Sequence, residues 1–149
     1  MKRFVITWSL AAVLFGLAGV AGAEKIDMPF VNISTSPDEL DLGTIMLFAD
    51  FYDVQAALTV DVDSNCMHGP IMISTTELKS RQGESISPER IFVKTPATNG
   101  FVTMARPVAI STPMEGPHKI VLNLRVQSNF IKPAGEYTGT ITLTIMPPA

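Results

Sequence analysis

The sequence predicts an all-β protein, an immunoglobulin-like antiparallel β-sandwich formed by a single domain over residues 24–149. Two observations lead to this prediction. Apolar and polar residues alternate with a period of two through three long segments, 54–62, 120–127 and 137–145, as half-buried antiparallel strands require. Turn-forming sequences separate about eight or nine short segments of this kind, which is the spacing typical of a sandwich.

The last of these segments is the clearest strand, because threonine occupies every second position from Thr138 to Thr144. Threonine favours extended backbone and tolerates solvent on an outer face. Shorter strands are predicted at 30–34, 40–47, 71–75 and 90–94, and one strand from 101 to 111 is expected to bend at Pro107. We expect a polar loop over 79–88 and a single helical turn within 49–57.

The first 23 residues predict a secretory signal peptide that is removed on export. Lys2 and Arg3 precede a nearly continuous apolar run over 4–20, and the small residues 21–23 are followed by Glu24. An uncleaved membrane anchor is the alternative, because the run is close to spanning length. No later apolar run is as long, so we expect a soluble mature protein that is secreted, periplasmic or on the cell surface.

The hydrophobic content of 46% and the mean hydropathy of +0.28 reflect this N-terminal run in large part. All 14 acidic residues lie beyond position 23, whereas two of the 11 basic residues lie before it. The mature chain is therefore mildly acidic and has no basic stripe. A nucleic-acid partner is not expected, because such proteins present clustered Lys and Arg.

Cys66 is the only cysteine, so no internal disulfide can form. Together with Met67, His68 and Met72 it offers thiol, thioether and imidazole groups, the ligands that soft Cu(I) prefers. The competing interpretation is a strand end with a buried cysteine and a solvated loop histidine. Adjacent residues of an extended segment point to opposite faces, so Met67 cannot join Cys66 and His68 without a turn. We predict no cofactor, and these four residues remain the copper candidates.

The sequence does not predict an enzyme. The chain has two histidines, His68 and His118, and lacks the short motifs of hydrolases, metalloproteases, nucleotide-binding and dinucleotide-binding proteins. Asp61 and Asp63 lie on one face of a predicted strand and indicate a polar outer face rather than a calcium site. The aromatic residues of 51–52 and Phe101 are either core residues or part of a ligand platform.

Residues 131–145 resemble the ending of spore coat protein U type secreted pilin domains and related bacterial immunoglobulin-like modules. A turn of sequence Pro-Ala-Gly-Glu-Tyr at 133–137 leads there into the threonine-rich strand. The segment Leu-Asp-Leu-Gly-Thr-Ile at 40–45 is similar to a short segment of the same family. The resemblance implies a surface subunit that a periplasmic chaperone and usher assemble by donating strands between subunits. It makes residues 24–34 the candidate donor.

We therefore expect an exported, non-enzymatic structural or interaction protein of pilin-like type. Its expected partners are other subunits or a chaperone and usher. One alternative is an immunoglobulin-like binding module for a glycan or an envelope protein. The other is a periplasmic copper-binding protein that uses the four candidates named above.

Overall fold

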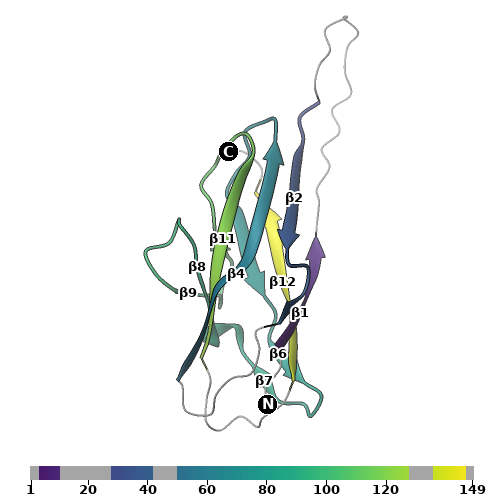
Figure 1. Ribbon diagram of the computed structural model, residues 1–149, viewed down its shortest axis with the longest axis vertical. Coiled ribbons are helices and arrows are strands. Elements are labelled where there is room, and N and C mark those ends of the chain that lie inside the picture. The colour runs from purple at the N-terminus through teal and green to yellow at the C-terminus, as the bar shows by residue number, and fades with distance from the viewer. Residues whose placement is uncertain (1–3, 11–27, 42–49, 128–135, 147–149) are drawn as a thin grey trace, which may run out of the picture.

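The computed structural model describes residues 4–10, 28–41, 50–127 and 136–146. It shows an all-β sandwich of two sheets (Figure 1), which confirms the predicted fold class, while the immunoglobulin-like topology stays a prediction. The one helical element in these ranges is a 3-10 turn at Pro88–Arg90. The strands in chain order are β1 (Phe4–Leu10), β2 (Val31–Ser36), β3 (Leu40–Asp41), β4 (Phe51–Ser64), β5 (Ile71–Thr75), β6 (Leu78–Ser80), β7 (Ser85–Ile86), β8 (Ile91–Lys94), β9 (Val102–Thr103), β10 (Val108–Ala109), β11 (His118–Gln127) and β12 (Tyr137–Ile145).

One sheet has the order β2-β4-β11-β8-β9 and is antiparallel throughout. Its centre is the long β4–β11 pair, which runs along the length of the molecule (Figure 1). Leu58, Val60 and Leu122 are fully buried on its inner face. The period-two pattern places these residues on that face, because successive side chains of a strand point to opposite sides.

The β4–β11 pairing is interrupted by a bulge. The register shifts between Leu122 and Leu124, and Ala56 of β4 has a φ of 46° there. The backbone N–H of Ala56 donates a hydrogen bond of 2.7 Å to Oδ1 of Asn123 on β11. The asparagine side chain thus replaces a ladder bond that the extra residues of β4 would otherwise lose.

The other sheet has the order β10-β5-β12-β1-β3, and β6 continues beside β12 and pairs with β7. β12 therefore has β5 and β6 on one side and β1 on the other. β1 runs parallel to β12, whereas every other pairing among the described strands is antiparallel.

A single cluster of buried apolar residues fills the space between the sheets. It draws on both sheets and on the loop residues Met104 and Ile110. Tyr137 is the largest of its fully buried side chains and lies at the start of β12. Close packing of this kind makes the cluster the main source of stability in a chain without an internal disulfide.

Three predictions about elements are wrong. Val102–Thr103 pairs with β8 in one sheet and Val108–Ala109 pairs with β5 in the other, so 101–111 is a crossing between sheets and not one bent strand. The expected polar loop over 79–88 contains β6 and β7, which pair through Leu78 and Ile86, both buried. The expected helical turn falls on the start of β4, where period-two burial prevails.

Other predictions lie partly outside the described residues. The predicted strand at 40–47 is confirmed at Leu40–Asp41, and its remainder lies outside them, as does the predicted turn at 133–135. Phe4–Leu10, which belongs to the predicted signal peptide, forms β1 in the full chain. Within the described ranges no helix has the length and apolarity needed to cross a membrane.

Candidate functional site

The candidate functional site is the edge of β12 that β1 covers. The seven residues of β1 lie in register with residues 137–143 of β12, starting from Phe4 opposite Tyr137. On its other side β1 pairs with β3 through Val5 and Ile6. β1 thus occupies the position between β12 and β3, where two sets of backbone N–H and C=O groups would otherwise lack partners in the sheet.

The buried face of β12 sets the chemistry of the strand that covers this edge. Tyr137 and Ile141 are fully buried and Leu143 is 3% exposed, while Thr138 and Thr144 face solvent. Residues in register on neighbouring strands share a face of the sheet. Positions 4, 8 and 10 of β1 are in register with these three buried positions of β12, and position 6 is in register with Gly139. The sequence of β1 has Phe, Ile, Trp and Leu at these four positions and Val, Thr and Ser between them.

A kink between β5 and β6 shapes the other side of β12. Thr76 donates its backbone N–H to the carbonyl of Thr140, and its Oγ1 accepts the N–H of Thr140, both at 2.9 Å. A methyl group built on Gly139 would lie 2.5 Å from Cδ2 of Leu78 and 3.2 Å from the carbonyl oxygen of Glu77. The absence of a side chain at Gly139 thus allows Leu78 to enter the core.

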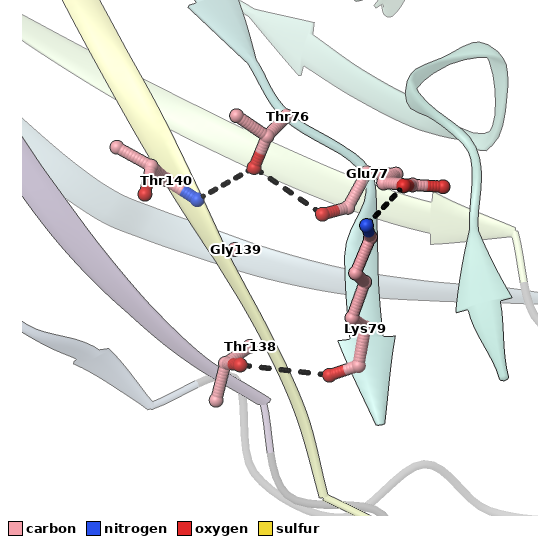
Figure 2. Close-up of a pocket in the computed structure, with 6 residues that line it drawn as sticks. All are labelled: Thr76, Glu77, Lys79, Thr138, Gly139 and Thr140. Carbon is pink, nitrogen blue, oxygen red and sulfur yellow. Dashed lines mark hydrogen bonds and ion pairs between the residues drawn. The ribbon is translucent and has the colours of Figure 1, made fainter. Parts of the chain in front are cut away.

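An open depression of about 490 Å³ lies over this kink, and Figure 2 shows the residues that line it. Lys79 and Glu77 form an ion pair of 2.8 Å at its rim, and both side chains are largely exposed. The hydrogen bond from Lys79 lowers the pKa of the Glu77 carboxyl, with the charge of Lys79 adding to the effect. The depression lies at Thr138–Gly139–Thr140, the same part of β12 that pairs with β1.

The segment that leads into β2 is held by a side-chain clamp. Asn65 accepts the N–H of Phe30 at 2.7 Å through Oδ1 and donates to the carbonyl of Met28 at 3.1 Å through Nδ2. Met28 and Phe30 are nevertheless 74% and 42% exposed. Residues 31–34, the last four residues of the predicted donor, are paired with β4. While β2 is formed, these residues cannot also pair with another subunit. A donor strand would therefore have to end before Val31.

The copper candidates are placed differently from one another. His68 is buried, Met67 is 52% exposed, and Cys66 donates weakly from Sγ to the carbonyl of Phe30 at 3.7 Å. Met72 lies on β5, where its backbone pairs with Ala109 and Thr144. Met67 is exposed and His68 is buried, because successive side chains of an extended segment point to opposite sides.

The neighbour that the structure gives His68 is His118, at the start of β11. The two ring centroids are 5.4 Å apart and the ring planes differ by 14°. Nδ1 of His68 lies 2.7 Å from the carbonyl oxygen of Gly69, and Nδ1 of His118 lies 3.0 Å from that of Gly116. Both Nε2 atoms are buried without a hydrogen-bond partner. The sequence contains no pattern that predicts this contact, because the two histidines are 50 residues apart.

The aromatic residues proposed as a platform separate into two groups. Phe51 and Phe101 lie on the outer face beside Arg125, whose guanidinium carbon is 5.1 Å and 4.0 Å from their ring centroids. Tyr52 instead packs against the core. Arg125 also makes a two-pronged ion pair with Asp53, at 2.6 Å and 2.7 Å. The exposed ring of Phe51 and the partly buried ring of Phe101 thus pack against the positive charge of Arg125.

Acidic residues on the outer face of β4 are paired with cations in the same way. Asp61 lies 3.1 Å from Nζ of Lys119. Across the described ranges no group of three or more His, Cys, Asp or Glu side chains is arranged to hold a metal ion. Asp63 is exposed on the same face of β4.

Comparisons with known proteins assign the chain to no family. No protein-family model matches the chain, and no curated protein matches it. Among solved structures, a family 123 glycoside hydrolase from Clostridium perfringens, described in a study of glycolipid glycan hydrolysis, is similar at a TM-score of 0.48 and 10% identity. The match covers 80% of this chain and 25% of the hydrolase chain.

Proposed function

We propose that the protein is an exported, non-enzymatic structural subunit of pilin-like type, and that the edge of β12 accepts a strand from another protein chain. The observation that carries the proposal is the position of β1 between β12 and β3. Its residues, Phe4–Leu10, fall within the predicted signal peptide. Cleavage after Ala23 would remove this strand and leave the edge without its partner.

An uncovered strand edge of this length lowers the stability of the folded chain. β12 would lose the backbone partners that β1 supplies along residues 137–143, next to the buried side chains of Ile141 and Leu143. Long apolar edges of this kind promote pairing with another chain. The mature protein is therefore expected to self-associate or to bind a strand from a partner by β-augmentation.

The register specifies the incoming strand. It has apolar side chains at four alternating positions and small or polar ones between them, as β1 has. Directly after the predicted cleavage point, Ile26, Met28 and Phe30 occupy three alternate positions. Met28 and Phe30 are exposed, and the paired part of β2 begins immediately after them.

The test uses the mature chain, residues 24–149, and a synthetic peptide with the sequence of residues 4–10. We expect the mature chain alone to unfold at low temperature or to form oligomers, and the peptide to raise its unfolding temperature in a concentration-dependent way. The matched control peptide carries Asp in place of Ile6 and Trp8, the two central positions in register with Gly139 and Ile141. It should have no effect, because a buried unpaired carboxylate is strongly disfavoured.

A clear negative result is available. The proposal is wrong if the mature chain is a monomer with a cooperative unfolding transition that neither peptide changes. It is also wrong if both peptides stabilise the chain equally, since alternation of the core-facing side chains would then not matter.

A further inference from the structure

The loop between β8 and β9 carries the one asparagine of the chain that is followed by a glycine. The asparagines at positions 32, 65, 99, 123 and 129 precede Ile, Cys, Gly, Leu and Phe in that order. Asn99 is exposed, and it lies between Lys94, the last residue of β8, and Val102, the first residue of β9. Surface loops move more than the strands that they connect. The side-chain amide of Asn99 can therefore approach the main chain of the next residue.

The peptide nitrogen that follows Asn99 is unobstructed. A methyl group built on Gly100 would have no heavy atom within 4 Å. Within the described part of the chain, no group accepts a hydrogen bond from the N–H of Gly100. The loop is held instead by Thr98, whose Oγ1 accepts the N–H of Thr95 at 2.9 Å and donates to the carbonyl of Gly100 at 2.9 Å. These bonds hold the turn and leave the nitrogen of Gly100 available.

The other described asparagines are placed differently. Asn65 and Asn123 each accept a backbone N–H through the side-chain oxygen, at 2.7 Å in both cases. Asn32 lies within β2 in a stretch that is paired with β4, and the residue after it is the β-branched isoleucine. Among the described residues, none forms a hydrogen bond with the side chain of Asn99. An uncommitted amide thus precedes an unhindered nitrogen at this position.

We propose that Asn99 is a modification site, at which the side-chain amide is lost as ammonia and an aspartate or isoaspartate residue forms. The nitrogen of Gly100 attacks Cγ of Asn99, the new N–Cγ bond closes a succinimide ring, and the Cγ–Nδ2 bond breaks. Nδ2 leaves as ammonia with the proton that the Gly100 nitrogen gives up. Water then opens the ring. Cleavage of the N–Cγ bond gives aspartate, and cleavage of the bond to the main-chain carbonyl carbon gives isoaspartate.

The isoaspartate product would alter the loop next to an aromatic contact. It has one additional carbon in the main chain, between Thr98 and the Gly100 carbonyl that Thr98 now binds. Phe101 follows directly, and its ring centroid lies 4.0 Å from the guanidinium carbon of Arg125. A longer main chain at position 99 would therefore displace Phe101 from Arg125. The site is independent of the edge of β12, because β8 and β9 belong to the other sheet.

The experiment incubates the purified protein in mildly alkaline buffer, which favours the attacking nitrogen, and follows tryptic fragments by liquid chromatography and mass spectrometry. Cleavage after Lys94 and Lys119 gives fragment 95–119, in which Asn99 is the only side-chain amide. We expect this fragment to gain the mass of an NH-to-O replacement and to separate into two forms, aspartate and isoaspartate. Fragment 120–125, with Asn123 as its only amide, is the internal control and should keep its mass.

Two comparisons test the mechanism and the role of the fold. Gly100→Val should lose most of the isoaspartate, because a β-branched side chain crowds the attacking nitrogen. The folded wild type should react within about 10-fold of the rate of a synthetic peptide of residues 95–119, because the loop is exposed and mobile relative to the strands. This second comparison needs no variant to fold.

Three results would overturn the proposal. In the first, fragment 95–119 keeps its mass, or gains it far more slowly than the synthetic peptide. In the second, aspartate forms without isoaspartate, which indicates direct hydrolysis and no succinimide. In the third, Gly100→Val is modified as fast as the wild type.

Discussion

At the scale of single residues, the structure explains why position 139 is a glycine. Gly139 lies opposite the kink between β5 and β6, where Leu78 is fully buried. Gly139 lies between Thr138 and Thr140, in the row of β12 that alternates with the threonines. The sequence pattern could not show why a glycine stands there, because Leu78 belonged to no predicted strand.

Gly139→Ala should destabilise the protein by about 1–3 kcal/mol, because the new methyl group would lie 2.5 Å from Leu78 in a closely packed core. Chemical denaturation monitored by circular dichroism measures the change. Gly100→Ala is the matched control, since no heavy atom lies within 4 Å of the position its methyl would take. Equal free energies of unfolding for the two variants would contradict this account.

A second residue-scale prediction concerns Asp53. The hydrogen bond from Arg125 holds the pKa of the Asp53 carboxyl below its usual value, and the charge of Arg125 also lowers it. The pair therefore contributes stability above about pH 4, and this contribution is lost as the pH falls through the lowered pKa. The contribution is small, since the side chains of Arg125 and Asp53 are 31% and 35% exposed and solvent screens them.

Asp53→Asn should lower the unfolding midpoint slightly at neutral pH and flatten its decline in acid, so that the two curves converge below about pH 3. Thermal unfolding measured from pH 7 to pH 3 gives both curves. Asp63→Asn, on the same strand, controls for the removal of one negative charge. A constant difference between wild type and Asp53→Asn at all pH values would show that packing, and not ionisation, causes the effect.

At the scale of elements, strand positions were largely predictable and strand partners were not. β5 and β12 have the predicted bounds because their alternation is regular. The partners of β9 and β10 depend on which sheet each short segment reaches, and two-residue strands carry no pattern that decides it. β1 was not predicted as a strand, for a different reason. Its alternation lies inside an apolar run that also satisfies the pattern of a signal peptide.

The bulge in β4 gives the element-scale prediction. Ala56→Gly should stabilise the protein by up to about 1 kcal/mol, because a φ of 46° is unfavourable for alanine and free for glycine. Asn123→Ala should destabilise it by about 0.5–1.5 kcal/mol, because the N–H of Ala56 loses its acceptor. Asn123→Asp keeps an acceptor oxygen and is the control. Changes of the same sign at positions 56 and 123 would argue against this role of the bulge.

At the scale of the whole molecule, the sequence predicts the sandwich because period-two burial is repeated in every long strand. The candidate sites could not be predicted from the sequence, because each brings together residues that are distant along the chain. The histidine pair joins the loop after β4 to the start of β11, and the covered edge joins the first described strand to the last. Local patterns specify which face a residue occupies, and the packing of the two sheets specifies its neighbours.

The parallel pairing of β1 with β12 also has a consequence for the timing of folding. β12 is the last described strand, so its partner β1 must wait until almost the whole chain has been synthesised. Pairing between distant segments is slow, because a long loop must close first. During translation residues 4–10 therefore lack this partner, and they can join the sheet only once β12 has been synthesised.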